Sequence, residues 1–360
     1  MRALLTGGAG FIGTRLSRAL VNQGYEVTVL DNLDPQIHGA ISGNPFVGTG
    51  VVFLKGDVTD SAVLSRLTRS RFDLVIHLAA ETSTGKSLNE ASKHAWVNVL
   101  GTTRLIDALS SNGKYPKHVI LPSSRSVYGE GEWIKPIDPN RPIGAGIREG
   151  ADLALGKWLP PGIPIDASPI ASAAHRTSPS PTSVYAATKL AQEHLLQAWC
   201  SARGVPLTIL RLQNVYGPGQ SLLNSYTGVL TLFARLAVAD EQVRIFEDGG
   251  IVRDFVYIDD VISAFLAACE YPPPSQRILD IGSGIPSTLL EIGQLVVDAA
   301  CAGNLAITGE FRPGDVRCAF CDIHRASEEI SWYPQTALDD GIGSLIKWIR
   351  SSKAFDGIGP

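Results

Sequence analysis

Short, continuously apolar stretches alternate with segments of helical periodicity along the first two thirds of the chain. Apolar residues recur at helical spacing over Val97–Leu109 and Ala187–Ala198. The β-prone stretches between such segments lack polar–apolar alternation, which is typical of parallel strands covered on both faces. They are Arg2–Thr6, Glu26–Asp31, Val51–Lys55, Asp73–Leu78, His118–Pro122 and Leu207–Arg211. The βαβα order predicts an α/β fold with a doubly wound parallel sheet.

After Gly217 the regular alternation of strands and helices ends, and the predicted elements become shorter. The expected strands and helices are Val243–Phe246, Phe255–Tyr257, Leu279–Ile281, Val261–Cys269, Leu289–Cys301 and Leu338–Ile349. This change predicts a first domain over residues 1–217 and a smaller α/β lobe over residues 218–360, some of whose segments return to the first domain.

Residues 130–181 interrupt the pattern with nine of the 22 prolines. Long loops inside compact domains tend to be functional lids or disordered insertions. Trp133, Arg148 and Trp158 in this insertion either line a pocket or pack a surface excursion, and the sequence leaves both interpretations open.

Composition narrows the class of protein. The chain has 360 residues, 44% of them hydrophobic and 18% charged, and its 31 basic and 35 acidic residues give a net charge of −4. Without a Lys/Arg run, we expect no nucleic-acid or membrane partner. An odd count of five cysteines argues against a disulfide framework, and the start of the chain lacks a secretory pattern, so we expect a cytoplasmic protein.

A glycine-rich turn follows the first predicted strand. Glycines at positions 7, 8, 10 and 13 fit the dinucleotide fingerprint, which needs a tight turn and close approach of backbone N–H groups to a pyrophosphate. Asp31 ends the second strand, where a carboxylate can bond the adenosine ribose, and Asn32 stands where an arginine would favour NADP. We therefore predict NAD; the alternative is that Asp31 is a turn residue. The expected cofactor contacts here are Gly7, Gly10, Phe11, Ile12, Gly13, Asp31 and Asn32.

Two further strand ends are candidate cofactor contacts. Asp57-Val58 and Leu78-Ala79-Ala80 follow the third and fourth strands, at the edge where open α/β sheets bind ligands. A helix N-cap is an alternative role for Asp57. The small Ala79 and Ala80 suit a flat cofactor passing over that edge.

A tyrosine and a lysine share one helix face. Tyr185 and Lys189 stand at i, i+4 on a helical pattern, and the cation would favour the phenolate of a residue that is otherwise a poor base at neutral pH. Upstream, the fifth strand ends in Ser123-Ser124, where a hydroxyl could hold a substrate oxygen.

These motifs together resemble the extended short-chain dehydrogenase/reductase family over nearly the whole chain except the insertion. Further matching segments are His77–Ala80, Asn98, Val127–Gly129, Arg211–Gly219, Arg253–Val261 and Arg312–Asp315. The resemblance implies an NAD-binding Rossmann domain, a lobe that binds a nucleotide-diphosphate sugar, and catalysis by Ser124, Tyr185 and Lys189. It also implies that Asn98 lies at the cofactor, that Asn214 contacts substrate, that Arg253 and Arg312 bind its diphosphate, and that helices near Val97–Leu109 and Tyr185–Ala202 form a homodimer.

Departures from the family pattern indicate the reaction. Sugar 4,6-dehydratases carry an Asp-Glu pair, and decarboxylases a Glu, where this chain has Arg125-Ser126. The family's epimerases need no such acid, so the resemblance implies a nucleotide-sugar 4-epimerase. Residues 81–85 and 124–131 look most like the dTDP-L-rhamnose 4-epimerase type, with Arg125 as a substrate contact. The alternatives are a nucleotide-4-ketosugar reductase and a non-catalytic dinucleotide sensor. The lone Cys318-x-x-Cys321 predicts no metal site, and His77 is expected to be a core residue.

Overall fold

A seven-stranded parallel sheet forms the centre of the molecule. The computed structural model describes residues 1–39, 43–111, 113–222 and 228–352. The strand order is β13-β9-β5-β4-β1-β2-β3, and every neighbouring pair is parallel. The strands are β1 (Arg2–Thr6), β2 (Glu26–Asp31), β3 (Val52–Lys55), β4 (Leu74–His77), β5 (His118–Ser124), β9 (Leu207–Leu212) and β13 (Gln276–Ile281). The doubly wound α/β fold is therefore confirmed.

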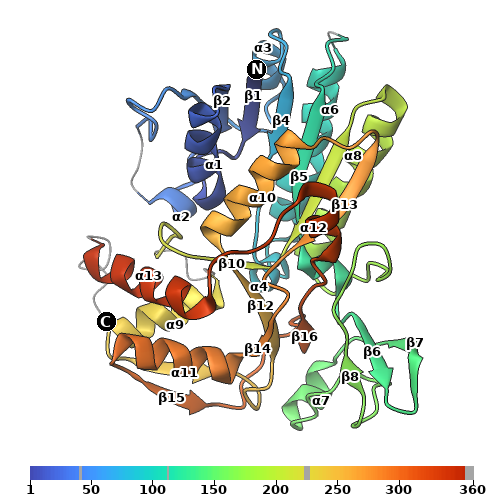
Figure 1. The fold of residues 1–360 in the computed structure, drawn as a ribbon, viewed down its shortest axis with the longest axis vertical. Helices are drawn as coiled ribbons and strands as arrows, with labels where there is room; N and C mark the ends of the chain where they lie inside the picture. Colours follow the sequence, from blue (N-terminus) through green and yellow to red (C-terminus); the bar gives the residue numbers. More distant parts are fainter. Residues whose placement is uncertain (40–42, 112, 223–227, 353–360) are drawn as a thin grey trace.

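Helices cover both faces of this sheet, as its continuously apolar strands require. On one face lie α1 (Phe11–Asn22), α10 (Ile258–Glu270) and α12 (His324–Ile330), and on the other lie α3 (Ser61–Leu67), α6 (Gly101–Ser110) and α8 (Val184–Arg203). Successive strand residues enter opposite cores: Leu5 packs with α1, whereas Leu4 packs with α6 and α8. Figure 1 shows α1 and α10 side by side.

One expected element belongs elsewhere in the fold. The Leu279–Ile281 stretch, expected among the short strands after Gly217, lies in β13, which pairs with β9 at the edge of the main sheet. The helices α10 and α12 return with it. The other six strands match their predicted positions closely, and β5 extends two residues further, to Ser124.

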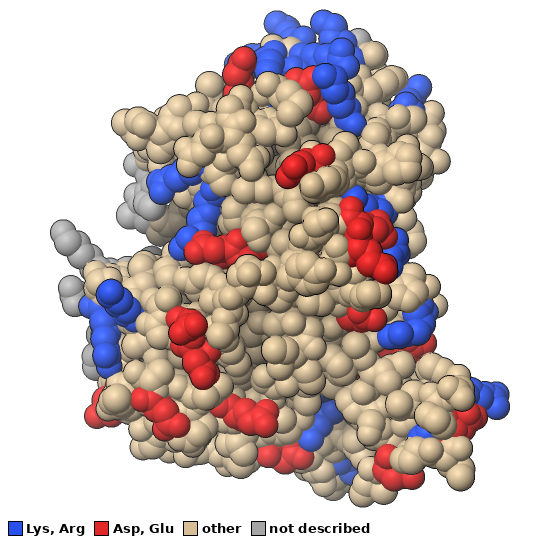
Figure 2. Space-filling model, in the orientation of Figure 1, with Lys and Arg blue, Asp and Glu red and all other residues tan. Residues whose placement is uncertain are grey.

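A second lobe stands beyond the carboxyl ends of the strands (Figure 1). Its sheet joins β10 (Asn214–Tyr216), β12 (Val252–Tyr257), β14 (Pro286–Thr288) and β16 (Cys318–Ala319), and a separate pair joins β11 (Gln242–Ile245) and β15 (Asn304–Ile307). The helices α9 (Val229–Val238), α11 (Leu289–Ala300) and α13 (Leu338–Ser351) enclose its own apolar core. Figure 2 shows acidic side chains predominating along the α11 and β15 edge, whereas basic side chains gather at the opposite end.

The proline-rich insertion is an ordered unit. It contains the three-stranded sheet β7-β6-β8, made of β6 (Glu132–Lys135), β7 (Asp138–Gly144) and β8 (Ser168–Pro169), together with α7 (Gly150–Ala154). Trp133 is buried in a small apolar cluster with Ile163 and Cys318, so this tryptophan packs the insertion. In Figure 1 the insertion lies beside the second lobe. None of the helices in the described residues is long and apolar enough to cross a membrane.

The remaining short helical segments flank the sheet edge where the site lies. They are α2 (Pro35–His38), α4 (Thr84–Ser87), α5 (Ala91–His94), a π-helix over Ala95–Leu100 and a 3₁₀ turn over Arg125–Tyr128.

Candidate active site

The glycine turn between β1 and α1 is shaped to accept a ligand. A Cβ at Gly7, where φ is +69°, would stand 2.5 Å from the Ala79 nitrogen, and one at Gly13 would stand 2.5 Å from Gly8 Cα. A Cβ at Gly10 would meet just the Gly7 oxygen, at 3.5 Å, so this side of the turn is open. Gly10 is the N-cap of α1, whose first N–H groups lack partners within the helix. The turn thus offers the exposed N–H groups that a pyrophosphate requires.

The acidic end of β2 is tied to this turn. Asp31 is buried, and its carboxylate accepts hydrogen bonds from the Ala9 nitrogen at 2.9 Å and the Leu33 nitrogen at 2.8 Å. Asn32 donates to Asp57 at 2.9 Å. Hydrogen bonds from Thr59 and Asn32 outweigh desolvation and lower the pKa of Asp57. Asp57 therefore remains a carboxylate. Both aspartates lie along one sheet edge, beside the glycine turn, and each also shapes its own turn.

The end of β4 forms the other side of the cofactor edge, opposite the end of β2. The close approach of Gly7 to Ala79 brings the first and fourth strand ends together, with Leu78 packed against the core and Ala80 following. Val58 is buried under Gly101 at the start of α6. The small side chains of Ala79 and Ala80 leave room over this edge of the sheet, which a flat cofactor requires. These residues fit NAD.

Asn98 lies on a π-helix, a conformation that often marks functional sites. Its side chain accepts from the Glu81 nitrogen at 2.8 Å and donates to the Glu81 oxygen at 3.0 Å and to Thr188 at 2.9 Å. Asn98 therefore joins the loop after β4 to the helix that carries Tyr185 and Lys189.

The predicted catalytic hydroxyls meet in the structure. Ser126 donates to Ser124 Oγ at 2.9 Å, and Ser124 hydrogen-bonds Tyr185. Burial raises the pKa of Tyr185 above its ordinary value, while the bond from Ser124 and the Arg125 cation act to lower it. Ser126 thus donates to Ser124, and Ser124 acts on the phenol oxygen of Tyr185. This arrangement can stabilise a phenolate.

Lys189 is buried one turn below Tyr185. Its Nζ donates to Gln192 Oε1 at 2.5 Å, and burial lowers the pKa of Lys189 to about 8 although Glu193 acts to raise it. The Gln192 amide in turn donates to Thr102 at 2.9 Å and lies 3.3 Å from His77 Nε2. The sequence reading missed Gln192, because nothing local distinguishes it from an ordinary helix residue.

His77 is a satisfied core residue, as expected. Its ring nitrogens lie 2.6 Å from Thr6 Oγ1 and 2.9 Å from Thr102 Oγ1, and burial lowers the pKa of His77 to about 3. The ring is therefore neutral, and its Nε2 donates to Thr102, which also accepts from Gln192 and donates to the Asn98 carbonyl. A polar chain consequently leads from Lys189 through the helix into the centre of the sheet.

Glu193 is a second buried residue that sequence reasoning missed. It accepts from Arg211 through both carboxylate oxygens, at 3.1 and 2.7 Å, and from the hydroxyl of Ser123. This pair fixes α8 against β5 and β9, so that the serine turn and the tyrosine helix keep their spacing.

The predicted substrate residues lie on the lobe side. Asn214 donates to the Asp254 carbonyl at 3.2 Å, joining β10 to β12. Arg253 is buried beside Arg125, and burial together with Arg253 lowers the pKa of Arg125 to about 9. Two adjacent cations suit an anionic group. Arg312 is exposed and its guanidinium lies 5.0 Å from the centre of the Phe246 ring.

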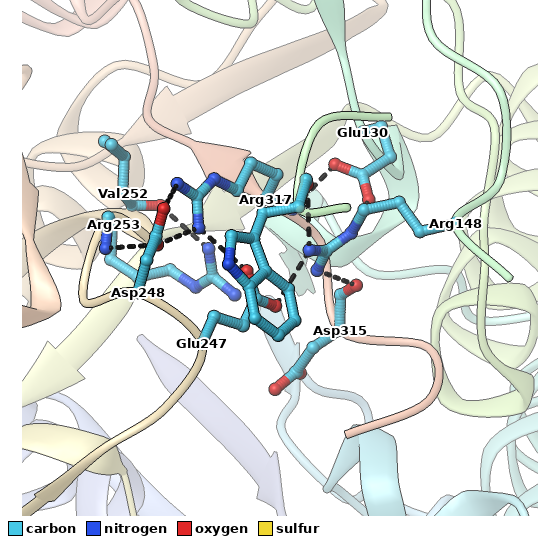
Figure 3. Close-up of polar contacts among 10 residues, drawn as sticks. Glu130, Arg148, Glu247, Asp248, Val252, Arg253, Asp315 and Arg317 are labelled. Atoms are coloured by element: carbon cyan, nitrogen blue, oxygen red, sulfur yellow. Dashed lines mark hydrogen bonds and ion pairs between the residues drawn. The ribbon is translucent and has the colours of Figure 1, made fainter. Parts of the chain in front are cut away.

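An ion cluster between the insertion and the lobe was also missed (Figure 3). Arg148 bonds Glu130 at 2.9 Å and Glu247 at 2.8 Å, and all three side chains are at most 3% exposed. Arg317 bonds the other oxygen of Glu247 at 2.8 Å and pairs with Asp248. Sequence proximity gives no sign of it, because Arg148 and Glu247 are 99 residues apart.

The two Cys-x-x-Cys thiols are buried, and burial raises the pKa of Cys318 to about 12. Over residues 1–39, 43–111, 113–222 and 228–352, no group of three or more His, Cys, Asp or Glu side chains is arranged to hold a metal ion.

Comparison with known proteins identifies the family. Residues 3–146 and 159–282 match the family model described as the NAD dependent epimerase/dehydratase family. The chain is 46% identical over 349 residues to a dTDP-L-rhamnose 4-epimerase from Burkholderia thailandensis, covering 97% of this chain and 94% of that protein. It is 30% identical to a UDP-glucose 4-epimerase from Mycolicibacterium smegmatis, covering 98% and 99%.

Solved structures show the same fold. The UDP-glucose 4-epimerase of Thermotoga maritima, solved with UDP-glucose, has a TM-score of 0.77 at 28% identity and covers 98% of this chain and 99% of its own. The Thermus thermophilus UDP-glucose 4-epimerase, solved with NAD, has a TM-score of 0.77 at 28% identity and covers 98% and 100%.

The chain belongs to the NAD-dependent epimerase/dehydratase family. Within it, the protein is an NAD-dependent nucleotide-sugar 4-epimerase.

Proposed function

We propose that the protein inverts C4 of a dTDP-6-deoxyhexose such as dTDP-L-rhamnose. The observation that carries this choice is the 46% identity over 97% of the chain to the Burkholderia thailandensis enzyme, against 30% or less to the UDP-sugar epimerases compared above. Arg125 supports it, because neither the acid pair of dehydratases nor the acid of decarboxylases follows Ser124.

We assign the acid–base chemistry to Tyr185. Its phenolate takes the proton of the C4 hydroxyl, and its phenol later returns that proton. Ser124 holds the C4 oxygen, and Lys189 and Arg125 supply positive charge that favours the phenolate. When bound, NAD would supply the acceptor for the C4 hydride and the donor that restores it to the other face of the keto-sugar. Gly7, Gly10, Phe11, Ile12, Gly13, Asp31, Asn32, Asp57, Val58, Leu78, Ala79, Ala80 and Asn98 would hold that cofactor.

On the substrate side, Arg253 and Arg312 would bind the diphosphate and Asn214 would contact the sugar nucleotide. Guanidinium groups suit phosphate oxygens, which they bond in pairs. The buried Arg253 beside Arg125 supports this assignment, since two close cations gain from an intervening anion.

We further propose a cytoplasmic homodimer formed through the helices near Val97–Leu109 and Tyr185–Ala202. Trp96 supports it, because this large apolar side chain is 59% exposed beside α6. Sedimentation that gives a monomer mass at micromolar concentration would exclude the dimer.

The test is epimer formation from dTDP-L-rhamnose followed by NMR, with UDP-glucose and UDP-galactose as competing candidates. Wild-type protein should equilibrate the dTDP-sugar without added coenzyme. Tyr185→Phe should bind NAD normally and lose at least about 10²-fold in turnover, the lower range for a general acid–base group. Turnover near wild type would remove Tyr185 from the chemistry. Protein that instead consumes NADH with a 4-keto sugar, and forms no epimer unaided, would be a reductase.

A further inference from the structure

The insertion meets the lobe through a small set of polar and charged groups, of which Glu130, Arg148 and Glu247 are buried. We call Glu130, Arg148, Glu247, Asp315 and Arg317 the junction. Figure 3 shows Arg148 pointing at Glu130 on one side and at the Asp315 carbonyl on the other. Its Nη2 donates to that carbonyl at 2.7 Å and its Nη1 to Glu247 at 2.8 Å. One side chain of the insertion therefore binds two separate segments of the lobe.

The junction adjoins the candidate site at both ends. Glu130 follows the 3₁₀ turn of Arg125, next to Ser124. At the other end, Gly314 precedes Asp315, and its carbonyl lies 3.4 Å from the hydroxyl of Thr182, three residues before Tyr185. The segment of residues 312–317 thus passes by the start of the tyrosine helix, and Arg148 holds it there.

The backbone of Glu247 has an unusual conformation, which points to a functional role. Glu247 has φ of +54°, a left-handed conformation that few non-glycine residues adopt. Its carboxylate accepts from Arg148 through one oxygen and from Arg317 through the other, each at 2.8 Å. Such conformations persist where surrounding bonds hold them, and they cluster at functional sites.

Resting on the proposed function, we propose that Arg148 is a positioning residue for the substrate's diphosphate. Its planar fork fixes the segment of residues 312–317, which carries Arg312, relative to Ser124 and Arg253. The proline-rich insertion is then part of the substrate site. Arg148 itself acts through Glu130, Glu247 and the Asp315 carbonyl.

Arg148→Met suits the test because each of the two carboxylates that Arg148 contacts keeps another hydrogen bond. Glu130 still accepts a hydrogen bond from the backbone nitrogen of Arg317 at 2.7 Å, and Glu247 still accepts one from the Arg317 guanidinium. The insertion also stays attached through Ser172, which exchanges backbone bonds with Phe320 and Asp322 at 2.9 Å. Arg148→Lys retains the charge without the fork. Lys157→Met is the matched control, because this exposed cation of the same insertion pairs only at the surface, with Asp152.

The experiment measures KM and kcat for dTDP-L-rhamnose, binding of dTDP by calorimetry, and NAD content. We expect Arg148→Met to raise KM and the dTDP dissociation constant about tenfold or more, with kcat within about threefold and NAD content unchanged. Arg148→Lys should fall between Arg148→Met and wild type, and Lys157→Met should match wild type. A lowered melting temperature with unchanged KM and dTDP binding would overturn the inference and show a merely structural role.

The two proposals fail in different ways. If wild type does not turn over dTDP-L-rhamnose, the proposed substrate is wrong, and calorimetry with dTDP, UDP and GDP still compares wild type with Arg148→Met. Equal binding of the preferred nucleotide by both proteins refutes the positioning role. Wild type that binds none of the three overturns both proposals. If Arg148→Met does not fold, Arg148→Lys decides by the same measurements: a raised KM with little change in kcat supports the proposal, and an unchanged KM refutes it.

Discussion

The side-chain oxygen of Gln192 accepts the hydrogen bond of the Lys189 ammonium. A substitution of Gln192 therefore perturbs Lys189 directly. In Gln192→Met, Lys189 Nζ loses its 2.5 Å bond to Oε1. His77 keeps its contacts to Thr6 and Thr102, and Thr102 still donates to the Asn98 carbonyl. The substitution therefore acts mainly on the lysine.

The size of the effect follows from the charge. A hydrogen bond to a charged group contributes about 1.5–3 kcal/mol, and each pKa unit corresponds to about 1.4 kcal/mol. The pKa of Lys189, which burial already lowers to about 8, should fall by a further one to two units or so. At pH 8 the ammonium fraction then drops from about one half to about 1–10%, so kcat should fall roughly 5- to 50-fold.

The assay is kcat against pH, from about pH 5.5 to 9.5. Because the ammonium is the active form, kcat is lost as pH rises through the pKa of Lys189, and this alkaline limb should move down by about one to two units in Gln192→Met. Gln192→Glu, which places a carboxylate beside the ammonium, should move the limb up. Gln197→Met on the same helix is the control. An alkaline limb that stays in place in Gln192→Met, with or without a fall in melting temperature, would refute the reasoning.

Two further outcomes follow from the structure. Asp31→Ala removes the carboxylate that accepts from the Ala9 and Leu33 nitrogens, so NAD should bind more weakly and the preference for NAD over NADP should shrink. A preference unchanged from wild type in fluorescence titrations would take Asp31 out of the ribose site. His77 is neutral when folded, with a pKa of about 3 against 6.5 unfolded, so its contribution to stability is present above pH 6.5 and is lost as pH falls. Between pH 7 and 5, wild type should lose about 2 kcal/mol more unfolding free energy than His77→Gln. Urea melts in which both proteins lose the same unfolding free energy over this pH range would contradict the prediction.

Local patterns carry the parts of this protein that a sequence reveals. The glycine turn, the end of β2 at Asp31 and the Tyr185–Lys189 spacing are each encoded within a few neighbouring residues, because backbone geometry and helix periodicity are local properties. Strand order is not local. Leu279–Ile281 reads as a short lobe strand, and its parallel pairing with β9 depends on a return of the chain to the main sheet that no residue pattern marks.

The missed site residues share one property, which is distance along the chain. Gln192 reaches Thr102 and His77 from 90 and 115 residues away. Arg148 reaches Glu247 across 99 residues and Asp315 across 167. Neither residue type is unusual on its own, so the sequence shows a polar side chain without showing that it becomes buried.

The insertion illustrates why burial decides between the two interpretations that the sequence left open. Trp133 packs with Ile163 and Cys318, and a comparable apolar residue could fill the same volume. Arg148 could not be replaced so simply, since two carboxylates and two carbonyls converge on its guanidinium. Removing a single partner from such a buried set is costly, whereas replacing the whole set by well-packed apolar groups would often be neutral or stabilising. This costly arrangement lies next to Ser124 and the start of the tyrosine helix, a position that argues for a role in geometry that stability alone does not explain.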